Sequence, residues 1–172
     1  ADYTPGFFSN KGSTTLTHQL ALLYLLESPF QCIAENPVKL VNHPLYKAIV
    51  PFIRDLPTTW DSCIVLPQSR IGSCAIVAKK SGDDWYIAAI NGHDKELVIH
   101  PDLSFIEQLP KYKATLVTDH NSRFKVAAVP AIDLAAMSFK LAPQGGWLLR
   151  LTRKNAAQSE HPVKSAENKI SN

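Results

Sequence analysis

The stretch SCAIVAKKSGDDWYIAAI, residues 73–90, decides how the second half of this chain folds. It holds two apolar runs with isoleucine, valine, tryptophan and tyrosine, separated by Ser81-Gly82-Asp83-Asp84. Such runs favour β-strands, and a short connection containing glycine and aspartate is typical of a hairpin turn. We therefore predict strands at residues 73–80 and 85–90, joined by a tight turn.

Similar short runs recur on both sides of this hairpin, with no helical pattern between them. Further strands are predicted at residues 61–66, 95–99, 113–118, 134–141 and 147–152, and another within 121–130. Seven or eight short strands at this spacing indicate an all-β antiparallel sandwich or Greek-key barrel. From residue 153 to residue 172 the chain is polar, which predicts a flexible tail.

The first 57 residues instead show helical patterns. A helix is predicted over residues 16–27, with a cap supplied by Ser13, Thr14 or Thr15. Its leucines cover much of its circumference, so it is expected to be buried on several sides. Because little in the next thirty residues could surround it, the pattern indicates a missing partner. Shorter helices are predicted at residues 29–34 and 44–56, the second kinked or split at Pro51.

The composition excludes several classes of function. With 45% hydrophobic and 19% charged residues, the chain resembles packed globular proteins and not disordered ones. The net charge is only +3, and the basic residues are scattered along the chain, which argues against a nucleic-acid partner. The longest apolar stretch, residues 20–26, is too short to span a membrane. Cys32, Cys63 and Cys74 form no C-x-x-C pair. Cys63 and Cys74 are expected to be buried free thiols, with a disulfide between them as the alternative.

Several motifs, in this order, resemble one known family. The motifs are DYTPGF (2–7), TTLTHQLA (14–21), ESPFQ (27–31), PTTWD (57–61), DWYIAAI (84–90) and LAPQGGW (141–147). The set is similar to the late barrel and C-terminal regions of glycoside hydrolase family 97. Ser62, Cys63, Cys74 and Lys79 depart from the family pattern, which indicates a divergent member. Since the chain begins at Ala1 and its only methionine is Met137, we expect it to be part of a longer protein.

The resemblance implies a fold and an activity. Members of this family are calcium-dependent, exo-acting enzymes that cleave α-glycosidic bonds, some inverting and some retaining, with two carboxylates flanking the scissile bond. They have an N-terminal β-sandwich, a (β/α)8 barrel and a C-terminal β domain. Residues 1–57 would then be the end of the barrel, a TIM-barrel remnant, and residues 58–152 the C-terminal antiparallel β domain.

The resemblance also places the catalytic carboxylates and the calcium ligands upstream of this chain. We therefore expect no catalytic residue and no metal ligand in it, and no activity of the chain alone. Its oligosaccharide substrate would bind through the missing barrel, and a complementary N-terminal portion of the same enzyme would be its partner. A periplasmic or secreted location follows from the same resemblance, and no membrane partner is expected.

A few residues merit consideration as site residues. Asp2 would face the substrate if it lies at the mouth of a barrel strand; otherwise it supports a turn around Pro5-Gly6. His18 is expected to be a satisfied buried histidine. The glutamates are expected to be solvated or capping side chains. The three tryptophans are either core residues or a sugar-stacking platform; they are Trp60, Trp85 and Trp147.

Two other functions remain open from the sequence. The chain could be an autonomous β-sandwich module that binds carbohydrate or protein through exposed tryptophans. It could also be a small complete hydrolase that uses Asp2 or His18. Sugar binding lost on Trp→Ala substitution would favour the first, and turnover lost on Asp2→Asn would favour the second.

Overall fold

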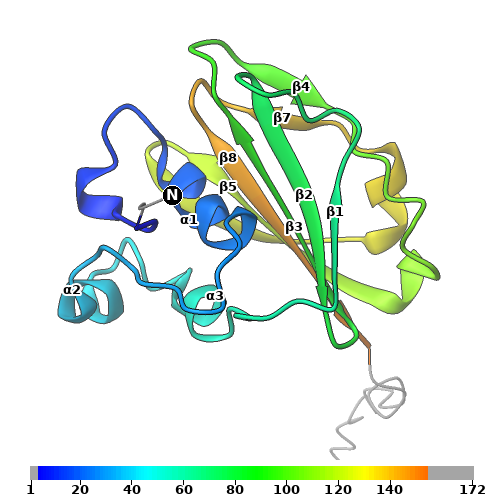
Figure 1. Ribbon diagram of the computed structural model, residues 1–172, viewed down its shortest axis with the longest axis horizontal. Coiled ribbons are helices and arrows are strands. Elements are labelled where there is room, and N and C mark those ends of the chain that lie inside the picture. The colour runs from blue at the N-terminus through cyan, green and yellow to red at the C-terminus, as the bar shows by residue number, and fades with distance from the viewer. Residues whose placement is uncertain (1–3, 155–172) are drawn as a thin grey trace, which may run out of the picture.

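The structure is a computed structural model that describes residues 4–154. Its elements form two β-layers with three short α-helices on one side (Figure 1). In chain order they are η1 (Phe8–Asn10), α1 (Leu16–Leu25), α2 (Pro37–Asn42), α3 (Val50–Arg54), β1 (Ser62–Val65), β2 (Cys74–Ser81), β3 (Asp84–Asn91), β4 (Leu97–Ile99), η2 (Leu109–Lys111), β5 (Tyr112–His120), β6 (Arg123–Val129), η3 (Ala131–Ala136), β7 (Phe139–Leu141) and β8 (Gly146–Arg153).

The larger layer is a six-stranded antiparallel sheet in the order β1-β2-β3-β8-β5-β6. The predicted hairpin lies between β2 and β3, where Ser81 pairs with Asp84 and leaves a two-residue turn. Gly82 has a φ of +58°, which glycine adopts without steric cost. The last strand, β8, occupies the middle of the sheet because it pairs with β3 on one side and β5 on the other.

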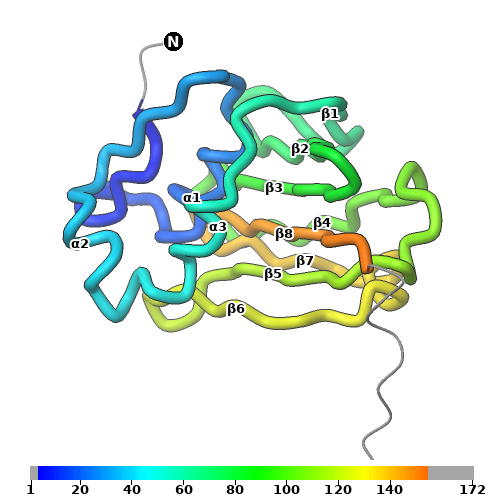
Figure 2. The backbone as a smooth tube through the Cα atoms, turned by 90° about the horizontal axis from the view of Figure 1, so that it is seen from below, coloured from blue at the N-terminus to red at the C-terminus, as the bar shows by residue number. Residues whose placement is uncertain are grey.

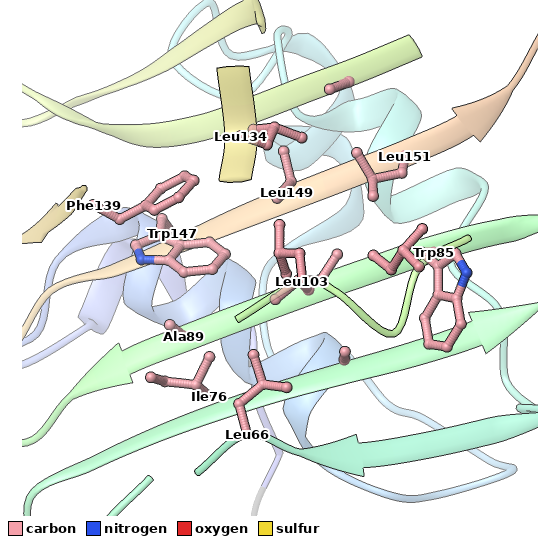
Figure 3. Packing of buried hydrophobic residues seen from close by; sticks show 14 of the residues in the cluster. Leu66, Ile76, Trp85, Ala89, Leu103, Leu134, Phe139, Trp147, Leu149 and Leu151 are labelled. Atoms are coloured by element: carbon pink, nitrogen blue, oxygen red, sulfur yellow. The ribbon is translucent and has the colours of Figure 1, made fainter. Parts of the chain in front are cut away.

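One face of this sheet packs against a second, two-stranded sheet formed by β4 and β7. Figure 3 shows the core between them, where Phe139 of β7 lies beside Trp147 of β8 and Leu134 of η3 lies over Leu149. The labelled members of this cluster are Leu66, Ile76, Trp85, Ala89, Leu103, Leu134, Phe139, Trp147, Leu149 and Leu151. Each such large apolar side chain contributes about 1.5–3 kcal/mol on burial. The chain is therefore mostly antiparallel β, consistent with a β-sandwich.

The opposite face of the large sheet is covered by α1. Leu20 and Leu23 of the helix pack with Tyr86 and Ala88 of β3 and Leu148 of β8. Figures 1 and 2 show the three helices gathered at one side of the strands, with α2 farthest from them. The central strands β3 and β8 are thus buried on both faces, which explains why they show little alternation of apolar and polar residues.

The helix approaches the sheet closely at Gly146. A Cβ atom at this position would lie 2.8 Å from the Cα of His18 and 2.9 Å from the carbonyl oxygen of Ala89. Only glycine leaves room for this contact. Gly146 therefore fixes the distance between the start of α1 and the centre of the sheet.

The expectation that α1 lacks partners within this chain is wrong for its main face. Leu20, Ala21 and Leu23 are completely buried, and the strands that cover them come much later in the sequence. Leu22, Leu25 and Leu26 are only half-buried. These three leucines therefore retain apolar surface that a further neighbour could cover.

Several local predictions also differ from the structure. No helix forms at residues 29–34; instead α2 begins at Pro37, where the Asn36 side chain accepts a hydrogen bond of 3.0 Å from the Lys39 amide. The predicted helix over 44–56 consists of turns followed by α3, which has Pro51 in its first turn. The predicted strand over 134–141 is η3 followed by the short β7. The predicted strand within 121–130 is confirmed as β6.

Two other predictions fall mostly outside the described residues. The tail predicted over residues 153–172 is described only at Arg153, which belongs to β8, and at Lys154. Asp2 also lies outside the described part of the chain. Within residues 4–154 the longest α-helix has ten residues, and no helix is long and apolar enough to cross a membrane.

Candidate functional site

His18, considered as a candidate from the sequence, is a buried structural residue. It lies in the first turn of α1, and its Nδ1 atom is 3.3 Å from the carbonyl oxygen of Gly145. Burial lowers the pKa of the imidazole, although hydrogen bonds to Gly145 and Gln144 and the charge of Asp119 act in the opposite direction. The side chain ties the helix to the turn before β8, as expected for a satisfied buried histidine.

Glu35 and Asp55 have pKa values that are shifted in the wrong direction for a general acid. A glycosidase needs one carboxyl whose pKa is raised so that it can protonate the leaving group. Burial alone would raise the pKa of Glu35, but hydrogen bonds from the Ser9 and Asn36 amides and the Ser9 hydroxyl bring it below its ordinary value. The Arg54 and Arg150 side chains lower the pKa of Asp55. These groups stay ionised at neutral pH and act as ties between elements.

Two of the three tryptophans are core residues. Trp147 is completely buried and stacks on Phe139 with ring centroids 4.7 Å apart. Trp85 is also buried and meets Phe105 edge to face at 5.1 Å. Trp60 is half-buried, with Tyr86 against its ring and the Lys79 ammonium 5.1 Å from its centroid. The tryptophans therefore do not form an exposed platform for a sugar.

The described residues also lack a metal centre. No group of three or more His, Cys, Asp or Glu side chains within residues 4–154 is placed to hold an ion. The three cysteines are free: Cys74 is buried as predicted, Cys63 is exposed, contrary to prediction, and Cys32 is exposed. A Cys63–Cys74 pair is not formed, because Cys63 lies opposite Lys79 and Cys74 opposite Asn91.

Both ends of α1 are held by charged side chains of the sheet. At the start of the helix, the Asp119 carboxylate accepts hydrogen bonds from the Thr15 hydroxyl at 2.5 Å and the Thr17 amide at 3.0 Å. At its end, the buried ammonium of Lys79 donates to the carbonyl oxygen of Leu26 at 3.1 Å and pairs with Glu27 at 2.7 Å. The signs of both charges complement the helix dipole. The sequence showed no signal for either tie, since both partners are far away along the chain.

An open apolar groove lies beside α1 on the same face of the sheet. Its volume is about 560 Å³, and its walls come from the ends of β1 and β3, the start of β2 and the loop of residues 69–73. Val65 is 65% exposed, and Ile71 of the loop is fully exposed. Arg70 is the charged residue among those that line it. The sequence could not reveal this groove, because alternation along a strand does not show which face is left uncovered.

The matching family model is described as "Glycosyl-hydrolase 97 C-terminal, oligomerisation" and covers residues 59–152. This segment includes the whole groove but not α1. It accounts for 94 of the 172 residues, counted from residue 59 through residue 152.

Two curated relatives extend the comparison. A retaining α-galactosidase from Bacteroides thetaiotaomicron is 31% identical over 156 residues, which are 87% of this chain and 23% of the relative. A probable retaining α-galactosidase from Streptomyces bingchenggensis is 33% identical over 89 residues, covering 50% of this chain and 13% of the relative. The chain thus spans less than a quarter of the length of these relatives.

Solved structures agree in fold. A glycoside hydrolase family 97 enzyme from Pseudoalteromonas sp. strain K8, in complex with acarbose, superposes with a TM-score of 0.74 at 27% identity over 90% of this chain and 26% of that enzyme. A β-arabinopyranosidase gives a TM-score of 0.68 at 27% identity, over 83% of this chain and 22% of that one. Both similarities extend beyond the 94 residues of the family model.

Proposed function

The chain belongs to glycoside hydrolase family 97, as part of its C-terminal portion, and from this membership we propose that it is the structural scaffold of a calcium-dependent, exo-acting enzyme that cleaves α-glycosidic bonds. The relatives are glycoside hydrolases several times longer than this chain. The catalytic carboxylates and the calcium ligands would then belong to polypeptide outside it. The observation that carries the proposal is the match of the family's C-terminal model to residues 59–152.

Residues 1–57 are proposed to be the end of the catalytic barrel. The support comes from the extent of the similarity: the Bacteroides relative matches 156 residues, whereas the C-terminal model covers 94. The half-buried leucines of α1 and the exposed Phe30 leave apolar surface available to a neighbour. The partner would be the N-terminal portion of the same enzyme, and Asp2 would lie at the rim of its substrate site.

The proposal predicts that this chain alone has no glycosidase activity. Nitrophenyl α-galactoside and α-glucoside should both remain intact when incubated with the purified chain, because the two catalytic carboxylates of the proposed enzyme would lie in polypeptide outside it. Release of nitrophenol is measured by absorbance, with the same substrates and a complete family member as the positive control. Turnover by the chain that disappears on Asp2→Asn would contradict the scaffold role.

The autonomous sugar-binding module is the weaker alternative. Its tryptophans would have to be exposed, yet Trp85 and Trp147 are buried in the sandwich core. Trp60 is the half-exposed exception, and its ring is already in contact with Lys79 and Tyr86. Calorimetry with the α-linked oligosaccharide panose, with Trp60→Ala as the comparison, tests this function; binding lost in that variant would support the module.

We also propose that the chain contributes to self-association of the enzyme. The family model that matches residues 59–152 carries oligomerisation in its description. The apolar groove beside β1 and β2 is a specific structural feature in favour of this second role, since large exposed apolar surfaces mark interaction sites. Association of the purified chain into a defined oligomer, measured by sedimentation velocity, tests it.

A further inference from the structure

The oligomerisation surface is expected to lie within residues 59–152, because the family model whose description names oligomerisation covers this segment. One face of the large sheet in this segment is closed by β4, β7 and η3, which form the sandwich core. The other face is covered by α1 over β3 and β8 but is open over β1 and the start of β2. The open part contains the groove.

Within the described residues of this segment, the exposed large apolar side chains are Val65, Ile71, Val98, Val126 and Ile132. Val98, Val126 and Ile132 lie on three different elements: β4, the edge strand β6 and η3. Only Val65 and Ile71 line the same hollow, together with the apolar side chains of Ala75, Val77 and Ile90. Two of the five exposed apolar side chains therefore meet at the groove, beside further apolar lining residues.

We propose that this groove is where a second copy of the chain docks, with Ile71 of each copy inserted into the groove of the other. This inference rests on the proposed role in self-association and adds its surface and its partner. Ile71 is fully exposed and lines its own groove, so two copies related by a two-fold axis through this region can each place Ile71 in the groove of the other. An isologous contact of this kind uses the same patch twice and closes as a dimer.

The chemistry of the groove suits this partner. An interface core is depleted of charge and rich in apolar side chains. Arg70 is the charged lining residue, and the serines at positions 69 and 73 add small polar groups. Ser69 is already satisfied by the backbone of Ile76, from which its hydroxyl accepts at 2.9 Å and to which it donates at 3.0 Å. Docking an aliphatic side chain there leaves that hydroxyl paired.

The reactivity of two native cysteines can report which surface becomes covered when the copies dock. Cys63 is exposed on β1, two residues before Val65 and on the same face of the strand, because Ile64 between them packs on the sandwich core. Two residues along a strand span about 7 Å, whereas a stable interface covers about 800 Å² per partner. Cys63 therefore lies within the covered surface. Cys32 is exposed in the loop between α1 and α2, outside the segment matched by the family model, and is the internal control.

The experiment measures alkylation rates of both cysteines by mass spectrometry at low and high concentration of the chain, alongside sedimentation velocity. We expect a dimer whose formation slows alkylation of Cys63 and leaves Cys32 unchanged. Ile71→Asp should raise the dissociation constant at least tenfold and restore the fast rate at Cys63. Ile132→Asp, which places the same charge on an exposed isoleucine of η3, should change neither quantity.

The outcomes separate this inference from the proposed self-association. A chain that stays monomeric at every concentration overturns both. A dimer in which Cys32 is protected and Cys63 is not, or which tolerates Ile71→Asp, overturns the groove and leaves self-association standing through another surface. Because Ile71 is fully exposed, its substitution should leave the fold intact, and an unchanged near-ultraviolet circular dichroism spectrum of the variant is the check.

Discussion

Lys79 holds a positive charge almost completely out of water. Its side chain is 1% exposed, whereas its ion-pair partner Glu27 is 64% exposed. The ammonium is also bound to the Leu26 carbonyl and lies over the Trp60 ring. A buried charge that loses its partner destabilises a protein more than the replacement of that charge by an apolar group.

The two members of this pair should therefore respond differently to substitution. Glu27→Gln is expected to lower the free energy of unfolding by about 1–3 kcal/mol, because it leaves the Lys79 charge buried without a counter-charge. Lys79→Met should lower it by about 1 kcal/mol or less, since methionine keeps the apolar stem. Urea unfolding followed by circular dichroism measures both changes.

The double variant and a surface control complete this comparison. Glu27→Gln added to Lys79→Met should cost little more than Lys79→Met alone, because the charge that needed Glu27 is gone. Lys113→Met, at an exposed position on β5, should stay within about 0.5 kcal/mol of the wild type. A larger loss for Lys79→Met than for Glu27→Gln would contradict this account of the pair.

At the scale of elements, the position of α1 on the sheet depends on the contact between its first turn and β5. Asp119 accepts hydrogen bonds from the Thr15 hydroxyl and from the Thr17 amide, and the Thr17 amide is a donor that the helix itself leaves unpaired. Asp119→Ala is expected to lower the free energy of unfolding by about 1–2 kcal/mol, the range found for the loss of helix caps. Hydrogen exchange should show faster opening of the α1 amides in this variant.

A matched control is available in the same fold. Asp133→Ala removes an exposed aspartate from η3 and should change stability by less than about 0.5 kcal/mol. Equal effects of Asp119→Ala and Asp133→Ala would mean that the contact with β5 does not hold the helix.

Most strands and the main helix could be predicted from the sequence, because their patterns are local. The hairpin at residues 81–84, the helix beginning at Leu16 and the turn before β8 all follow from side-chain chemistry within a few residues. Asn36-Pro37, a capping residue followed by a proline suited to a first turn, also marks the N-terminus of α2, although no helix is predicted there. The pattern at residues 134–141 did not distinguish a 3-10 turn from a strand.

The pairing of distant elements could not be predicted in the same way. No local pattern shows that Asp119 and Lys79 hold the two ends of α1, or that the sheet covers Leu20 and Leu23. For this reason the sequence predicts a missing partner for α1, although strands of this chain cover its main face. The groove escaped prediction for the same reason, since its existence depends on where α1 stops covering the sheet.

At the scale of the whole molecule, residues 1–57 protect one face of the large sheet. Tyr86, Ala88, Val117 and Leu148 are buried on this side against α1 and its neighbouring turns. Deletion of residues 1–57 is expected to expose them and to cause aggregation or poor solubility, because contiguous apolar surface promotes association. Light scattering and binding of a hydrophobic dye should both increase relative to the complete chain.

The sequence pattern predicts the opposite arrangement, in which the helix over residues 16–27 needs a missing partner to cover it. The structure gives the helical segment a protective role for the β-layer in addition to any contact with a barrel. Equal scattering and equal dye binding by the shortened and complete chains would show that the β-layer does not need this cover.

The central place of β8 has a consequence for biosynthesis. A ribosome delivers β1, β2 and β3 and later β5 and β6, but the strand that joins these two halves is translated after all of them. Until Arg153 has left the exit tunnel, β3 and β5 each present an open edge of unpaired amide and carbonyl groups. The sheet can therefore form completely only after translation of its last strand. A nascent chain that stalls before residue 146 exposes the unpaired edges of two partial sheets, which are prone to aggregate unless chaperones bind them.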